Sequence, residues 1–235
     1  MNLRKFFSKN KEIDNKTVKK TKNPASTEEI TAKPVTHDTI NPIESFITRL
    51  KSDPTLFSFD IVMALAEIEE KHTMPALLAA LNNDDIKIRK KTIGAVDSIA
   101  NSRFLASLNP DSKDWKKDPA IQASVDIGDD RVVEALISAL QDEVIDTNTR
   151  KSAVNALGTL GQTGDKRAVE PLLAALKDEA WTVRFQAADC LVKIYKDGKL
   201  DETHSRLIED KKAAIKSILP SERIQNLCKN GLWPF

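Results

Sequence analysis

Hydrophobic residues between positions 42 and 195 recur with the spacing of amphipathic helices arranged in pairs. In the last pair, Val169, Leu172 and Leu176 lie at i, i+3 and i+7 of a first helix, which places them on one face. A second helix follows with its own apolar stripe, formed by Val183, Ala187, Cys190, Leu191 and Ile194. A pair of this kind cannot bury both apolar faces alone, so the pattern predicts that successive pairs stack on one another.

The paired pattern recurs along the chain, which is typical of solenoid proteins. The segment Gly128–Leu136 matches Gly164–Leu172, because both follow the order G-D-x-R-x-V-E-x-L. Weaker copies lie upstream, and the most degenerate spans 101–127, where Phe104 and Leu108 align with leucines of the last unit. The predicted units are 42–69, 70–100, 101–127, 128–161 and 164–195. We therefore expect an all-α fold, a right-handed α-α superhelix of about five helix pairs.

Two residues predict how the degenerate unit is built. Pro119 has no backbone N–H and is best placed at the first position of a helix, with Asp118 before it as the N-cap. The second helix of this unit is therefore expected to be short and to follow a long loop over 109–117.

The N-terminal end of the chain departs from the repeat. Residues 1–22 carry eight basic residues, two acidic residues and few apolar ones, so they cannot bury enough surface to offset the entropy of ordering. We expect 1–41 to be a disordered basic tail. Its start, Met1–Phe7, leaves open a weak contact with an anionic membrane surface.

The C-terminal end, 196–235, predicts a helical cap. Gly198 is expected to end the last repeat as its C-cap. One helix is expected over 202–219, ended by the proline that follows it, and Ser221 is the expected N-cap of a short last helix. Trp233 and Phe235 are expected to pack against this cap, with an exposed aromatic tail as the alternative. Such a cap would cover the open end of the last repeat.

The units resemble HEAT repeats. Besides the G-D-x-R-x-V-E-x-L segments, they have an acidic residue in the inter-helix turn and an arginine at the start of the second helix. Asp142 with Arg150, and Asp178 with Arg184, fill these places, and they are expected to cap the turn or form a ladder. More narrowly, the units resemble the short HEAT-like repeats of phycobilisome bilin lyase subunits and of many prokaryotic scaffold proteins. The resemblance covers roughly 42–195 and implies a fold rather than one function.

The amino-acid composition adds little to the predicted fold and points to no particular class of partner. The net charge of +1, with 30% charged residues, shows no overall bias toward nucleic acid or membrane. No apolar run approaches the ~20 residues of a spanning helix and no secretory signal is seen, so we expect a cytoplasmic protein. Cys190 and Cys228 follow neither a disulfide framework nor a metal-binding spacing.

No residue pattern predicts catalysis. None of the three histidines has a second histidine at helical spacing, and the sequence lacks a nucleophile elbow, a phosphate-binding glycine loop and a dinucleotide fingerprint. The His-Glu pairs of the di-iron hydroxylases built on this fold are also missing. We therefore expect no catalytic, cofactor-binding or metal-binding residue, and a protein that is not an enzyme.

A candidate binding surface follows from helix geometry. At about 100° per residue, the side chains opposite the core of each second helix form a row that faces the concave side of such a solenoid. The row and its neighbours contain Phe59, Lys87, Lys90, Lys91, Asp118, Lys151, Trp181 and Phe185. Asp189 and Val192, further along the last of these helices, are expected to point the same way. Its centre is basic and its ends are aromatic. The alternative is that the lysines are simply solvated and flanking segments cover the aromatic side chains.

These observations favour a non-catalytic scaffold that holds a protein or peptide partner in the concave groove. One alternative is a lyase or chaperone-type subunit that handles a bilin or another cofactor, as the resemblance implies. A second is nucleic-acid binding through the basic tail and Lys90, Lys91 and Lys151, which the overall charge balance makes the weaker hypothesis.

Overall fold

The computed structural model describes residues 41–53, 55–109, 111, 117–123 and 125–231. The predicted disordered tail, except for Asn41, therefore lies outside the described residues, as do Trp233 and Phe235. Among the described residues every element is helical and none is a strand. The α-helices are α2 (Pro42–Ser52), α3 (Ser58–Ala66), α4 (Glu70–Leu81), α5 (Ile86–Leu108), α6 (Pro119–Gln122), α7 (Asp130–Gln141), α8 (Thr147–Thr163), α9 (Val169–Ala175), α10 (Trp181–Asp197), α11 (Glu202–Asp210), α12 (Lys212–Ile218) and α13 (Ser221–Lys229), and a 3₁₀ turn, η3 (Lys166–Ala168), precedes α9.

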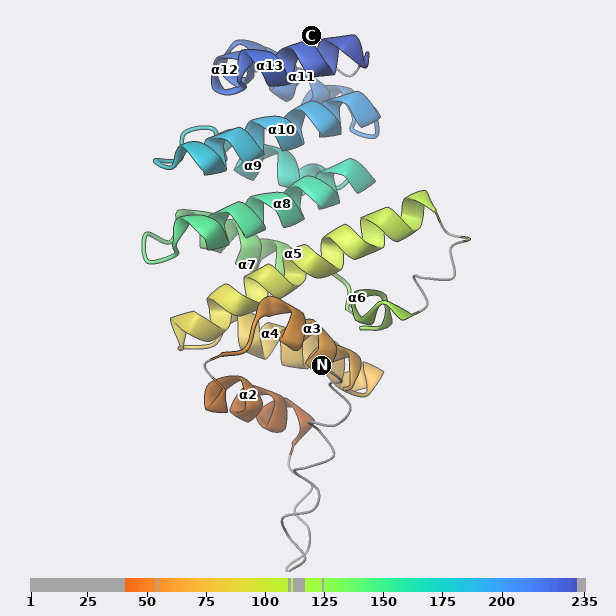
Figure 1. Ribbon diagram of the computed structural model, residues 1–235, viewed down its shortest axis with the longest axis vertical. Coiled ribbons are helices and arrows are strands. Elements are labelled where there is room, and N and C mark those ends of the chain that lie inside the picture. Colours follow the sequence, from red (N-terminus) through yellow and green to blue (C-terminus); the bar gives the residue numbers. More distant parts are fainter. Residues whose placement is uncertain (1–40, 54, 110, 112–116, 124, 232–235) are drawn as a thin grey trace, which may run out of the picture. The chain divides into compact units, whose positions relative to one another are not determined.

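Helices from successive pairs stack in two rows (Figure 1). The first helices form one row, in which α4 packs on α2, α7 on α4 and α9 on α7; the second helices form the other, in which α5 packs on α3, α8 on α5 and α10 on α8. The second helices pack against one another more extensively than the first helices do. This arrangement confirms the predicted all-α, helical-repeat solenoid.

Two glycines allow the second helices to approach closely. A Cβ at Gly158 of α8 would lie 2.3 Å from the Cys190 Sγ of α10, and one at Gly161 would lie 2.3 Å from the Ile194 Cδ1. Any larger residue at these positions would therefore require Cys190 or Ile194 of α10 to shift. The helical propensity that each glycine costs is offset by the dispersion contacts of the close approach.

The predicted degenerate unit 101–127 is not a separate helix pair, so this part of the sequence prediction is wrong. α5 runs without a break to Leu108, and α4 and α5 pack directly on α7 and α8. Phe104 therefore lies on the C-terminal extension of α5. No glycine or proline interrupts the helix near residue 101, and the Asn101 side chain donates to Asp97 one turn earlier (2.7 Å), which suits a continuous helix.

The short helix inside this segment was predicted correctly. α6 begins at Pro119, and the Asp118 carboxylate accepts from the Ala120 N–H. The Arg103 guanidinium, projecting from the α5 extension, donates to the carbonyl oxygens of Ala123 (2.6 Å) and Val125. The extension of α5 therefore holds the chain that leaves α6.

The C-terminal cap differs from its prediction in two details. The helix expected over 202–219 is divided at Lys211 into α11 and α12, although no glycine or proline lies there. Both helices pack on α10, and each buries one isoleucine completely, Ile208 in α11 and Ile215 in α12. Ser221 is the first residue of α13 rather than its N-cap, because Pro220 occupies the cap position.

Candidate partner-binding surfaces

An arginine ladder joins successive repeats and determines which charges are available to a partner. The Arg150 guanidinium is almost fully buried and donates to both carboxylate oxygens of Asp178 in the next inter-helix turn, at 2.9 and 3.1 Å. It also donates to the Ile145 carbonyl oxygen (2.7 Å) and to Glu179 (2.9 Å). The Asp178 carboxylate raises the pKa of Arg150, so this guanidinium stays charged and engaged.

The ion pairs of the ladder join residues of successive repeats, whereas the sequence suggested pairs within one repeat. Arg89 lies 3.7 Å from Asp142 of the following repeat, in the same relation as Arg150 to Asp178. Arg184, in the last repeat, donates instead to carbonyl oxygens of its own turn at 2.7 and 2.8 Å. The consensus acids therefore form ion pairs with the arginine of the preceding repeat.

A second set of ion pairs lies at the start of the first helices. The Asp165 carboxylate accepts from Arg167, whose guanidinium also reaches Asp130 and the Gly128 carbonyl oxygen of the preceding repeat. In that preceding repeat, hydrogen bonds from Arg131 lower the pKa of Asp129 to about 2. The G-D-x-R segments therefore have a structural role, and their charges are already paired.

The predicted lysines lie on the surface of the second helices. Lys87 and Lys151 are exposed, and Lys91 is half-buried. Lys90 forms an ion pair with Asp146 of α8 (3.2 Å). Burial raises the pKa of Asp146, but hydrogen bonds from Thr149 and Lys90 outweigh it and leave that pKa below its usual value. Lys90 is thus partly neutralised, and Lys87 and Lys151 present the most accessible charge of this set.

The predicted aromatic residues remain in contact with solvent. Trp181 stacks on Phe185, with ring centroids 5.3 Å apart, and still exposes 51% of its surface. Phe59 at the start of α3 exposes 56%. We define the second-helix surface as Phe59, Lys87, Lys90, Lys91, Lys151, Trp181 and Phe185. Asp118, which the sequence put in the same row, instead caps α6.

Part of the surface expected on α10 is covered. Asp189 and Val192, predicted to point away from the core, are both buried. Arg223 of α13 donates to Asp189 at 2.8 Å, and Lys193 lies 2.9 Å from the same carboxylate. The C-terminal cap therefore covers this part of α10, while Trp181 in its first turn stays exposed.

A half-buried carboxylate lies beside the second-helix surface and had no signal in the sequence. Asp97 of α5 lies between α5 and α8, where it accepts from Asn101 and Asn155. Burial raises the pKa of Asp97 to about 6, although hydrogen bonds from Asn155, Ser152 and Asn101 and the charge of Lys151 act in the opposite direction. Asp97 is therefore a carboxyl group that titrates close to neutral pH.

Replacing Asp97 by asparagine should stabilise the protein at pH 7 by about 1–3 kcal/mol. Because the folded-state pKa of about 6 exceeds the unfolded value, the native state binds the extra proton, and stability is lost as pH rises from about 4 to 6. The variant should show no such loss. Urea unfolding of both proteins at several pH values measures the difference. Asp129→Asn is the control: because the pKa of Asp129 is lowered, its stability difference from the parent protein should change with pH in the opposite direction. Equal curves of unfolding free energy against pH for Asp97→Asn and the parent protein would contradict the assignment.

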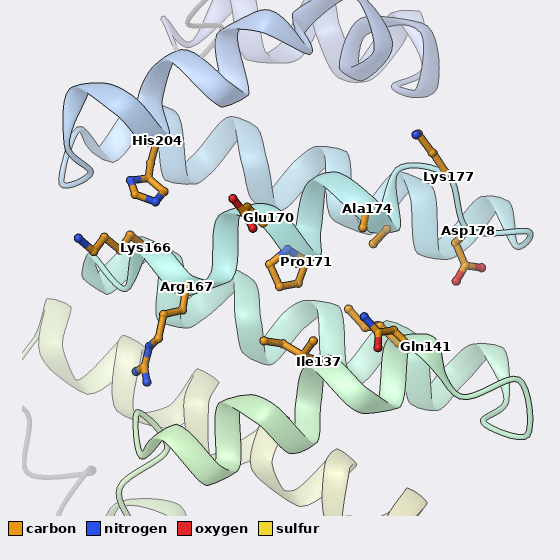
Figure 2. Close-up of a pocket in the computed structure, with 12 residues that line it drawn as sticks. Ile137, Gln141, Lys166, Arg167, Glu170, Pro171, Ala174, Lys177, Asp178 and His204 are labelled. Atoms are coloured by element: carbon orange, nitrogen blue, oxygen red, sulfur yellow. The ribbon is translucent and has the colours of Figure 1, made fainter.

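A groove of about 830 Å³ opens on the other face of the stack, between α7 and α9, with α11 at one end (Figure 2). Ile137, Leu140, Pro171 and Ala174 form its apolar floor. His204, Lys166 and Arg167 lie at one end, and Lys177, Asp178 and Gln141 at the other. No sequence pattern indicates this groove, because it depends on the spacing of first helices, which pack less extensively than second helices.

Within the described segments, no group of three or more His, Cys, Asp or Glu side chains could hold a metal ion. The helices described above also include none that is both long enough and apolar enough to cross a membrane. Burial raises the pKa of the Cys190 thiol to about 11, which keeps that thiol protonated and unreactive.

Comparison with known proteins supports the repeat assignment. A family model described as HEAT repeats matches residues 103–191 and 146–217. These matches support a HEAT-repeat protein and do not confirm the narrower resemblance to phycobilisome bilin lyase subunits. The comparison with curated proteins gave no match. A solved structure titled as the crystal structure of an engineered protein, Northeast Structural Genomics Consortium Target OR329, is 20% identical, with 82% of this chain and 98% of that chain covered and a TM-score of 0.30.

Proposed function

We propose that this chain, a helical-repeat solenoid with HEAT repeats, is a non-catalytic scaffold that binds a protein or peptide partner on its second-helix surface. HEAT repeats commonly mediate protein interactions, and a solenoid offers an extended surface rather than a single enclosed pocket. The proposal does not depend on a cofactor, since none of its contacts involves one.

One observation carries the proposal. The stack buries most of its large apolar side chains, yet Trp181 exposes half of its surface while stacked on Phe185. Tryptophan is enriched at interaction sites, because a rigid aromatic ring loses little entropy and buries a large area when a partner covers it. Lys151, exposed on the adjacent helix α8, adds a charge at the rim, where charges chiefly affect association rate and specificity.

The test begins with capture of partners from native lysate by the full chain, followed by measurement of the affinity of the purified partner. Trp181→Ser combined with Phe185→Ser should weaken that affinity by about 30-fold or more, equivalent to ~2 kcal/mol for a central aromatic anchor. Lys151→Glu should weaken it less and more strongly at low salt. Lys90 is unsuitable for charge reversal, because its ion pair with Asp146 would be replaced by two like charges.

A matched control keeps this test specific. Leu105 on the α5 extension exposes 50% of its surface, so Leu105→Ser removes a comparable exposed apolar side chain outside the second-helix surface. It should leave affinity unchanged. If the aromatic double variant keeps full affinity while its thermal midpoint is unaltered, the partner does not bind at Trp181 and the proposal fails.

A further inference from the structure

We infer that the partner of the second-helix surface places an arginine side chain between α5 and α8, where the carboxylate of Asp97 receives it. The inference rests on the proposed function and adds the chemistry of one contact, a guanidinium of the partner opposite a carboxylate of this chain. The contact is separate from the exposed aromatic side chains of α10, so it can be tested without them.

Asp97 differs from the other aspartates that are buried or half-buried among the described residues. Each of those others either accepts from a backbone N–H in a turn or at the start of a helix, or pairs with an arginine of this chain. The first kind comprises Asp53, Asp60 and Asp118, and the second comprises Asp129, Asp142, Asp165, Asp178 and Asp189. Asp97 instead lies within α5 and accepts from the uncharged amides of Asn101 (2.7 Å) and Asn155 (3.5 Å). No ion pair of its carboxylate is found within the described part of the chain.

This arrangement lowers the stability of the fold. Burial raises the pKa of Asp97 to about 6, although hydrogen bonds from neutral side chains, the strongest from Asn155, oppose the rise. The carboxylate therefore loses hydration without an ion pair that offsets the loss. A residue that weakens its own fold beside a binding surface is expected to serve that surface. The missing cation is then supplied by the partner.

The Asp97 carboxylate is open on one side. Asn101, which donates to one of its oxygens, is exposed, whereas the hydrogen bond from Asn155 to the other oxygen is partly buried. Lys151 of α8 is exposed, and its charge lowers the pKa of Asp97. Because that pKa nevertheless stays raised, Lys151 offsets only part of the cost of burial. A second cation therefore still gains from approaching the open side.

The next carboxylate along the second helices shows which basic group such a site accepts. Arg223 of α13 donates from Nε to the buried Asp189 of α10 at 2.8 Å, and Lys193 lies 2.9 Å from the same carboxylate. The charges of Asp97 and Asp189 both act on the Cys190 thiol, so the two sites are neighbours. A guanidinium presents several N–H donors in one plane and suits a carboxylate better than an ammonium does. The partner's residue is therefore arginine rather than lysine.

The test compares two short peptides as probes, acetyl-Leu-Arg-Leu-amide and the same peptide with citrulline, the neutral isostere of arginine. Titration of the full chain, observed through the backbone amide signals of α5 and α8 in nuclear magnetic resonance spectra, measures each Kd. We expect the arginine peptide to bind about fivefold or more tightly than the citrulline peptide at about pH 7.5. Asp97→Asn should remove this preference, and it should fold, because it is expected to be more stable than the parent protein.

The preference should also depend on pH. Since arginine binds the ionised carboxylate, the Kd of the arginine peptide should rise about tenfold from about pH 7.5 to about pH 5, where a carboxyl group with a pKa of about 6 is mostly protonated. The Kd of the citrulline peptide should not follow this change, and neither should the Kd of either peptide for Asp97→Asn.

Control variants separate this inference from the proposed function. Asp210→Asn removes an exposed carboxylate of α11 and should leave the preference for arginine unchanged. The variant that carries Trp181→Ser and Phe185→Ser should change both Kd values by the same factor, so a failure of the aromatic anchor is distinguishable from a failure at Asp97. The inference is overturned if the parent protein binds both peptides equally, or if Asp97→Asn still prefers the arginine peptide.

Discussion

Replacing Arg150 by alanine should lower the free energy of unfolding by about 3–5 kcal/mol, because it leaves one partner of a buried ion pair behind. The Arg150 side chain is only 7% exposed and that of Asp178 only 10%. The variant would strand the Asp178 carboxylate and the Ile145 carbonyl oxygen, which Arg150 now satisfies. Urea unfolding followed by circular dichroism measures the change.

Arg131 provides the control for this experiment. It also forms an ion pair with an aspartate, Asp129, but its side chain is 64% exposed, so Arg131→Ala should cost less than ~1 kcal/mol. Asp178→Asn keeps the oxygen that accepts from the Ala180 N–H. When it is combined with Arg150→Ala, the loss of stability should be much smaller than the sum of the two single losses. Equal costs for Arg150→Ala and Arg131→Ala would show that the ladder does not hold successive repeats together.

Leu172→Ala and Leu136→Ala should each cost about 2–5 kcal/mol, the usual range for a leucine removed from a packed interior. Both side chains are fully buried, in α9 and α7 respectively. Each deletion leaves a cavity between the two helix rows that the surrounding side chains fill only in part. Denaturation midpoints in urea, with the slope of the transition checked for constancy, measure the loss.

Leu105 is again the matched residue, since it is a leucine in a helix with half of its surface exposed. Leu105→Ala should change stability by well under 1 kcal/mol, because little apolar area leaves water at that position on folding. If the buried and exposed leucines cost the same, the helix faces described for α7 and α9 are wrong.

Local signals predicted several elements correctly. Asp118 and Pro119 predicted the start of α6, since an N-cap carboxylate and a proline without an N–H act within one turn of the chain. Gly198, expected to end the last repeat, adopts φ 63° after α10, a conformation that glycine takes at little cost. The continuous α5 was missed, because apolar residues at helical spacing fit one long helix and two short ones equally well.

The candidate surfaces were also predictable from the sequence only in part. The exposure of Trp181 and Phe59 could be anticipated, because helical periodicity places them opposite the core. The burial of Asp189 could not, since it depends on Arg223, 34 residues later, reaching back from α13. The α7–α9 groove also had no sequence signal, because its width depends on how two helices of different repeats pack.

The sequence by itself determined the all-α class, the paired helices and most buried positions, because hydrophobic periodicity and capping act over one or two turns of helix and recur in each repeat. Only the tertiary structure decided that 101–127 extends α5 instead of forming its own pair. It also decided that Arg150 pairs with Asp178 of the next repeat and that the cap closes part of α10. These outcomes depend on distances between residues far apart in the chain, which stacking of the repeats creates and local pattern does not contain.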